Sequence, residues 1–252
     1  MKSRLIAQIL VIVLSIAFVS IQSGCTDLKE ELSKHYRIMK PEGTGPFPAV
    51  MMVPGCSGFE LGKESYDRVQ KRLRELGFAT LRVDSLAARN ATDCRLAQLL
   101  PQKGADDIYI AAEYLLQQPF AKKGAINIIG WSWGGAAALL ALRPPESQTP
   151  IPFDAVVAYY PACEWVKKWD SEIPVLVLAG SLDNVAPFSK CEALFSTLPN
   201  QNILTVRIYE GAHHGFDDFQ LTTKKNFAFG TMAYNESAAK SAWMEVTNFL
   251  HK

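Results

Sequence analysis

The residues best suited to chemistry lie in the sequence Gly-Trp-Ser-Trp-Gly at positions 130–134. It matches the G-x-S-x-G pattern, in which a serine occupies a sharp turn between a strand and a helix. The apolar residues 126–129 predict the strand, and the small residues within 133–141 predict the helix. Free N–H groups at the start of that helix favour negative charge beside the serine. The pattern therefore predicts a nucleophilic Ser132.

A serine hydroxyl needs a general base at neutral pH, and histidine is the commonest one. Of the four histidines, His35 and His251 lie near the ends of the chain, where we expect them to be solvated. His213 and His214 follow a predicted strand that ends at Tyr209, which agrees with the order serine, acid, histidine. One of these two is the expected base, and spacing alone does not separate them.

The base needs an acid that orients its ring and stabilises its charged form. Asp183 follows a predicted strand at residues 175–179 and precedes the histidines. Asp217 and Asp218 come after the histidines, and we interpret them as part of a solvated loop or the start of a helix. Asp154 precedes a strand, at the wrong end of the sheet. Asp183 is therefore the preferred acid, with a turn-forming aspartate as the alternative.

Two backbone N–H groups are needed to bind the oxyanion of an acyl-transfer reaction. One is expected from Trp133, directly after the serine, and the other from the loop after the first parallel strand. That loop has the sequence Pro-Gly-Cys-Ser-Gly at residues 54–58, so the N–H of Cys56 is the candidate. The Cys56 thiol is alternatively half of a disulfide or a second nucleophile, and no motif supports the second role.

Short apolar runs alternate along the chain with segments of helical periodicity. The predicted strands cover residues 49–53, 79–83, 126–129, 155–159, 175–179 and 203–209. This alternation predicts a mostly parallel sheet with helices on both faces. The candidate residues follow strands, where such sheets bind their ligands.

Composition narrows the class of protein. The 252 residues, 48% of them hydrophobic, are enough for one α/β domain, which we place at residues 46–252. A formal net charge of +1 provides no basic surface for nucleic acid. Residues 26–45 are expected to be a polar leader.

Residues 1–25 have the features of an export signal. Lys2 and Arg4 precede an apolar run at residues 5–21, which Cys25 follows closely. A small residue before a cysteine is typical of bacterial lipoproteins, although Gln22 departs from that pattern. We expect either a lipid anchor on Cys25, an ordinary cleaved signal or an uncleaved membrane anchor. The protein is thus expected to be periplasmic or membrane-anchored, touching membrane only through this segment.

The other cysteines are Cys56, Cys94, Cys163 and Cys191. An even set in an exported protein permits disulfides, and four cysteines allow three connectivities. No two cysteines have the close spacing of a zinc site. We therefore expect no metal and no cofactor.

With these residues identified, the chain resembles the dienelactone hydrolase family from about Pro46 to Leu250. The resemblance rests on residues 47–50, 54–58, 83–85, 130–135 and 209–216. It implies an α/β-hydrolase fold and a small ester or lactone as substrate. The family has one histidine two residues before a phenylalanine, which selects His214 before Phe216. The family's acid falls on Asp183.

The chain also departs from the family. Founding members use a cysteine nucleophile where this chain has Ser132, and residues 54–55 read Pro-Gly where the family has His-Gly. Residues 89–90 read Arg-Asn in place of Arg-Gly. Arg89 is a candidate for binding a substrate carboxylate, or else a solvated surface residue.

No insertion is long enough for a cap domain, so loops at residues 86–104 and 216–234 are expected to roof the site. Trp165 and Trp169 either line the acyl pocket or pack a short loop. Phe216 is a further candidate for substrate contact. Relatives with this cysteine pattern imply structural disulfides, for which we expect the pairs Cys163–Cys191 and Cys56–Cys94.

Two other classes of function remain open from sequence. One is an exported lipoprotein that keeps the fold as a binding scaffold without turnover. The other is acyl transfer or peptide cleavage by the same three residues, because the shape of the pocket decides the substrate. The oligomeric state is also open.

Overall fold

The computed structural model of the chain describes residues 28–144, 150–167 and 171–251. The predicted signal at residues 1–25, with Cys25, and the predicted pocket residue Trp169 lie outside these ranges. Among the described helices, none combines the length and the apolar character needed to cross a membrane.

Within the described residues, seven strands form one sheet in the order β1-β3-β2-β4-β5-β6-β7. The strands are β1 Arg37–Met39, β2 Phe47–Val53, β3 Ala79–Arg82, β4 Ala121–Trp131, β5 Ala155–Tyr159, β6 Val175–Gly180 and β7 Leu204–Tyr209. All neighbouring pairs are parallel except β1 with β3. A separate antiparallel hairpin consists of β8 (Lys225–Phe227) and β9 (Gly230–Met232).

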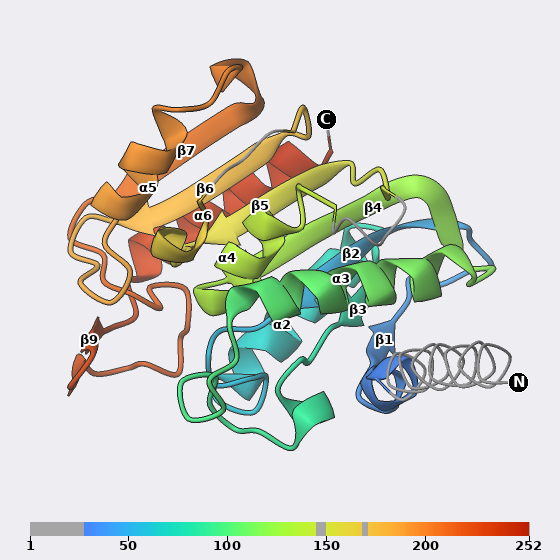
Figure 1. Cartoon of the computed structure of the whole chain (residues 1–252), viewed down its shortest axis with the longest axis horizontal. Helices are drawn as coiled ribbons and strands as arrows, with labels where there is room; N and C mark the ends of the chain where they lie inside the picture. Colours follow the sequence, from blue (N-terminus) through green and yellow to red (C-terminus); the bar gives the residue numbers. More distant parts are fainter. Residues whose placement is uncertain (1–27, 145–149, 168–170, 252) are drawn as a thin grey trace, which may run out of the picture.

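Helices cover both faces of this sheet (Figure 1). They are α2 Lys63–Glu75, α3 Pro101–Leu116, α4 Trp133–Leu140, α5 Ser189–Phe195 and α6 Glu236–Leu250, with short 3-10 helices η1 Ala87–Arg89, η2 Cys163–Trp165 and η3 Gln201–Ile203. One core cluster packs α3, α4 and α5 on one face, and a second packs α2 and α6 on the other. The mostly parallel α/β architecture predicted from sequence is confirmed.

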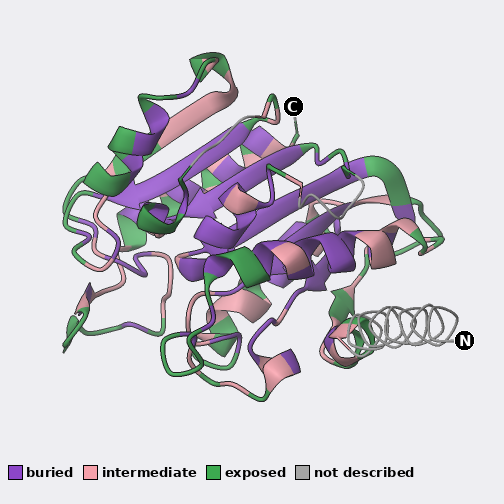
Figure 2. Cartoon of the chain, in the orientation of Figure 1, coloured by how far each residue is buried: buried purple, intermediate pink, exposed green. Residues whose placement is uncertain are grey.

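The central strands are buried on both faces, which explains their continuous apolar sequences. The side chains of Ala49 to Val53 in β2 and Val175 to Leu178 in β6 have no exposed surface. Figure 2 shows these central strands in purple, while the exposed residues, in green, lie mainly in loops and on parts of the helices. Because the strands run parallel, the loops after β2, β4, β5, β6 and β7 emerge at one edge.

The segment interpreted as a polar leader belongs in part to the domain. Residues 28–34 are helical, and β1 adds an antiparallel strand to the edge of the sheet. Leu32 is completely buried and packs with Ala88 and Ile110, with Leu28 and Tyr36 against them. Leu28 and Leu32 are four apart and share one face of this helix, and Tyr36 follows its end, so the segment packs on the domain through these three side chains.

The connection from β5 to β6 contains only the short η2 among its described residues. No cap domain is evident, in agreement with the expectation from sequence. The carboxyl edge of the sheet is therefore covered by loops.

Candidate active site

Ser132 lies in a tight turn between β4 and α4, as the sequence pattern predicted. Its backbone adopts φ 53° and ψ −114°, in a region that residues other than glycine rarely occupy. A Cβ added at Gly130 would collide with the backbone of Gly134. One added at Gly134 would collide with the carbonyl oxygens of Val53 and Pro54. Glycine on both sides thus lets the turn pack tightly and present the serine.

The three predicted catalytic side chains meet above the carboxyl edge of the sheet. Nε2 of His214 lies 2.9 Å from Oγ of Ser132, and Nδ1 of His214 lies 2.8 Å from Oδ2 of Asp183. Asp183 comes from the loop after β6 and His214 from the loop after β7. Both are almost fully buried. The contacts form one continuous series from carboxylate to ring to hydroxyl.

The loop after β6 holds Asp183 in place. Oδ1 of Asp183 accepts hydrogen bonds from the backbone N–H groups of Val185 and Ala186, each at 2.9 Å. Its other oxygen is left for the histidine. Because both carboxylate oxygens are engaged, the side chain has little freedom to rotate away from the imidazole.

The structure separates the two adjacent histidines. The ring of His214 faces Ser132 and Asp183, whereas Nδ1 of His213 lies 3.0 Å from the carbonyl oxygen of Leu182. His213 therefore bonds to the loop after β6 and not to the serine.

Cys56 and Trp133 line the same cavity as Ser132. Trp133 is the first residue of α4, where an N–H has no acceptor within the helix. The loop of Cys56 is held by Tyr66, whose hydroxyl accepts a hydrogen bond from the N–H of Gly55 at 3.1 Å. Both residues predicted to supply the oxyanion donors thus line the cavity of Ser132.

The structure contains two disulfide bonds, Cys56–Cys94 and Cys163–Cys191. These are the pairs expected from the resemblance. The first links the loop after β2 to the loop before α3, and the second links η2 to α5. Since the sulfur of Cys56 is bonded to Cys94, this structure leaves it no role as a second nucleophile.

A polar cluster that sequence reasoning missed lies against the histidine. The hydroxyl of Tyr160 donates to Oδ1 of Asp217 at 2.6 Å, and Nε1 of Trp131 donates to Oδ2 at 2.8 Å. The ring centroid of Tyr160 is 4.4 Å from that of His214. Tyr160 directly follows β5, so its position after a parallel strand was the available signal. Its φ of 36° turns the chain there.

Asp217 corrects the interpretation as a residue of a solvated loop. Burial raises the pKa of its carboxyl, although the hydroxyl of Tyr160 and the indole N–H of Trp131 act in the opposite direction. Burial also raises the pKa of the Tyr160 hydroxyl well above its usual value, with the nearby Asp217 adding to the effect. Burial therefore disfavours the charged form of both groups.

A cavity of about 580 Å³ opens beside Ser132. Both segments predicted to roof the site contribute to it. Residues 86–104 supply Cys94 and Arg95, and residues 216–234 supply two acidic residues together with Phe227, Phe229 and Met232. Trp165 lines the cavity as well, which agrees with its proposed place in a pocket.

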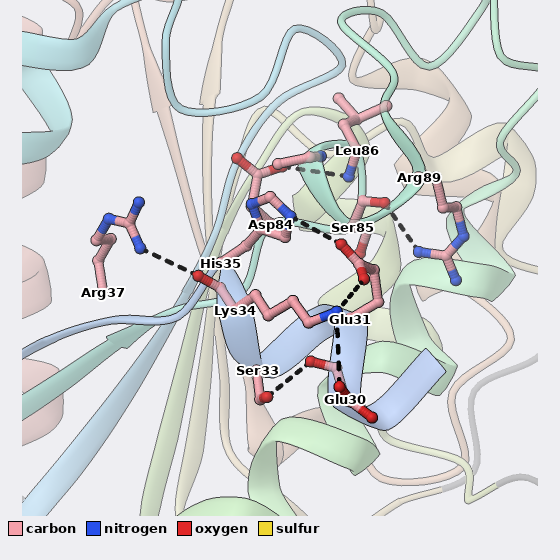
Figure 3. A network of polar contacts seen from close by, with 11 residues as sticks. Glu30, Glu31, Ser33, Lys34, His35, Arg37, Asp84, Ser85, Leu86 and Arg89 are labelled. Carbon is pink, nitrogen blue, oxygen red and sulfur yellow. Dashed lines mark hydrogen bonds and ion pairs between the residues drawn. The ribbon is translucent and has the colours of Figure 1, made fainter. Parts of the chain in front are cut away.

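Two predicted substrate contacts are not supported by the structure. Nη1 and Nη2 of Arg89 lie 2.7 and 2.9 Å from the two carboxylate oxygens of Asp107, which is completely buried. Figure 3 shows Arg89 beside residues 84–86, bonded to the carbonyl of Ser85. A buried carboxylate needs such a partner, so the guanidinium is occupied. Phe216 is also completely buried and packs on Tyr159. Neither Arg89 nor Phe216 lines the cavity.

Comparison with known proteins places the chain in a family. The sequence model of the dienelactone hydrolase family matches residues 35–252. A Bradyrhizobium protein named probable 2-oxo-3-(5-oxofuran-2-ylidene)propanoate lactonase is 26% identical over 229 residues, covering 84% of this chain and 87% of its own.

Solved structures share the fold. A dienelactone hydrolase-like promiscuous phosphotriesterase from metagenomic libraries has a TM-score of 0.62 at 18% identity, covering 86% of this chain and 98% of its own. A thermophilic esterase from Thermogutta terrifontis has a TM-score of 0.58 at 14% identity, covering 84% and 86%. The family match and the Bradyrhizobium relative support a hydrolase of the ester or lactone type. The chain belongs to the dienelactone hydrolase family.

Proposed function

We propose that this protein is a serine hydrolase that cleaves a small carboxylic ester or lactone through an acyl-enzyme intermediate. The observation that carries the proposal is the buried series of contacts from Asp183 through His214 to Ser132, which ends at the cavity. Each contact has the length that proton transfer requires. The strained turn and the adjacent helix N-terminus supply the remaining parts of such a site.

In the first half of the reaction, Nε2 of His214 takes the proton of Ser132 while Oγ attacks the carbonyl carbon of the substrate. The carbonyl electron pair moves onto the oxygen, where the N–H groups of Cys56 and Trp133 bind it. Asp183 stabilises the charged imidazole. The oxyanion then collapses, the ester C–O bond breaks, and the leaving alcohol takes the proton from His214. In a lactone the alcohol stays attached to the acyl group.

In the second half, a water molecule takes the place of the alcohol. His214 accepts a proton from this water as it attacks the acyl carbon, and returns the proton to Oγ of Ser132 when the acid leaves. The enzyme is restored without an external oxidant or cofactor. The name of the Bradyrhizobium relative supports a lactone as one form of the substrate.

Site-directed variants test the proposal. Ser132→Ala is expected to lower kcat/KM on a short p-nitrophenyl ester by roughly four to six orders of magnitude, because the nucleophile is lost. His214→Ala should have an effect of similar size. His213→Ala is the matched control and should be mild, because this ring bonds to the carbonyl of Leu182.

A fluorophosphonate probe separates an enzyme from a binding scaffold. Folded wild-type protein should be labelled at Ser132, and the Ser132→Ala variant should not. Wild-type protein that unfolds cooperatively but is neither labelled nor active on any ester would contradict the proposal. A severe effect of His213→Ala with a mild effect of His214→Ala would reverse the assignment of the base.

We also propose that residues 1–25 direct export. The two disulfides support this, because such bonds persist in oxidising compartments. The intact mass of the mature protein tests it. A mature chain that begins at Cys25 with an added lipid supports an anchor, whereas a full-length chain with four free thiols contradicts export.

A further inference from the structure

The charged side chains that line the cavity are mostly acidic. Glu164, Asp217 and Asp218 line it, and Arg95 is the one lysine or arginine among its lining residues. Nη2 and Nε of Arg95 lie 2.5 and 3.1 Å from the carboxylate oxygens of Asp93. The guanidinium also stacks on Phe229, 4.0 Å from the ring centroid. Arg95 is therefore already paired, and the described residues that line the cavity include no other lysine or arginine for an anionic ligand.

Glu164 and Asp218 differ in their surroundings. Asp218 accepts hydrogen bonds from the hydroxyl of Ser65 at 2.5 Å and from the N–H of Gln220 at 3.0 Å. Glu164 is exposed at the cavity and has no hydrogen bond or ion pair with another described residue. Burial raises the pKa of Asp217 and so opposes its charge, whereas Glu164 is open to solvent.

The rest of the lining is apolar and exposed. Leu61, Trp165, Phe227 and Phe229 leave 65, 48, 42 and 40% of their surface in contact with solvent. The rings of Phe227 and Phe229 stack with their centroids 4.9 Å apart. Exposed apolar side chains grouped around a reactive centre favour a ligand that covers them. An apolar acyl or alcohol group would remove this surface from water.

We propose that the cavity prefers apolar acyl groups and discriminates against esters whose acyl group carries a carboxylate, in contrast to the propanoate lactone in the name of the Bradyrhizobium relative. A carboxylate would lose its hydration on entry and would face the carboxylates of Glu164 and Asp218. Arg95 is the one lysine or arginine among the described residues that line the cavity, and its bond to Asp93 leaves it unable to compensate. This inference rests on the proposed serine hydrolase function and names its substrate class.

Three p-nitrophenyl esters of similar size test the selectivity: the heptanoate, the adipamate and the adipate. The adipamate and the adipate differ only by an amide in place of a carboxylate. We expect kcat/KM to fall in the order heptanoate, adipamate, adipate, with the adipate at least tenfold below the adipamate at low salt. The ratio of kcat/KM for the adipate to that for the adipamate should rise toward one as added salt screens the acidic residues. An adipate hydrolysed as fast as the adipamate would overturn the inference.

A charge reversal at the cavity tests the cause. Glu164→Lys should raise the adipate to adipamate ratio of kcat/KM several-fold, and Glu164→Gln should raise it less. Glu75→Lys is the matched control, because Glu75 ends α2 on the surface and does not line the cavity. It should leave the ratio unchanged. Equal shifts from Glu164→Lys and Glu75→Lys would overturn the assignment to this cavity.

Failure of this inference can be told apart from failure of the proposed function. If the wild-type protein hydrolyses all three esters without discrimination and Ser132 is labelled, only the selectivity is wrong. If no ester is hydrolysed and Ser132 is not labelled in folded protein, both are wrong. A cationic ester, p-nitrophenyl 4-(trimethylammonio)butyrate, completes the series. Its kcat/KM should exceed that of the adipate, because the carboxylates of Glu164 and Asp218 attract a cation, and a value below that of the adipate would overturn the role of these acids.

Discussion

Replacing Tyr160 with phenylalanine tests whether Asp217 is a carboxylate held beneath the catalytic histidine. The hydroxyl of Tyr160 donates to Oδ1 of Asp217 at 2.6 Å, and Trp131 supplies the second donor. Tyr160→Phe removes the first donor and keeps the ring, whose centroid lies 4.4 Å from that of His214. The variant therefore isolates one hydrogen bond to one acid.

The size of the effect follows from the charge of the acceptor. A hydrogen bond to a charged group contributes about 1.5–3 kcal/mol, and one to a neutral group about 0.5–1.5 kcal/mol. Burial raises the pKa of Asp217 in the folded protein above its value in the unfolded chain. The free energy of unfolding therefore falls as the pH rises through the folded-state pKa, because the buried carboxyl must then become charged. Loss of the donor raises this pKa further. The loss of stability in Tyr160→Phe should thus be larger at pH 8 than at pH 4.5.

Urea unfolding at the two pH values measures the difference, each variant being compared with wild type at the same pH. Tyr109→Phe is the matched control, because the hydroxyl of Tyr109 donates to the neutral backbone carbonyl of Ala141 at 3.0 Å. Its loss of stability should be about 0.5–1.5 kcal/mol at both pH values. If Tyr160→Phe loses the same amount at pH 4.5 and at pH 8, the acceptor is not an ionisable carboxyl and the reasoning fails.

Two other predictions concern contacts beside the site. Arg89→Met should lower the free energy of unfolding by about 3–5 kcal/mol, because Asp107 is left buried without a partner. The ratio of kcat/KM for the adipate to that for the adipamate should stay unchanged in this variant. A lower ratio would show that Arg89 does bind the substrate carboxylate. Replacing Cys56 and Cys94 together with serine removes a crosslink between residues 38 apart and should cost about 4 kcal/mol in thermal unfolding. It should also lower kcat, because Cys56 carries a proposed oxyanion donor, and full kcat would show that the crosslink does not position this donor.

Much of the fold and the serine turn could be predicted because their signals are local. A strand buried on both faces must be apolar along its whole length, as β2 and β6 are. The turn at Ser132 requires small residues at Gly130 and Gly134, whatever the rest of the chain does. The predicted strand ends therefore lie within a few residues of the observed ones, except in β4. This strand begins with the polar sequence around Lys122 and Lys123, so the apolar pattern did not indicate its first residues.

The contacts that could not be predicted join residues far apart in sequence. Tyr160 and Asp217 are 57 positions apart, and nothing near either residue indicates the other. Arg89 and Asp107 are 18 apart, and only the path of α3 brings the carboxylate to the guanidinium. His213 and His214 are neighbours, so spacing alone did not separate them, and only the resemblance to the family selected His214. The export signal stays a prediction.

The serine turn and the cavity rim are held by different kinds of contact, and this separates reactivity from selectivity. Backbone atoms approach each other so closely around Gly130 and Gly134 that a single added carbon is excluded. Around the cavity, exposed side chains are presented by Leu61 in a turn, Trp165 in η2 and Phe227 in β8. Substitutions at these three positions should therefore change which acyl groups are accepted, while the backbone conformation at Ser132 stays the same.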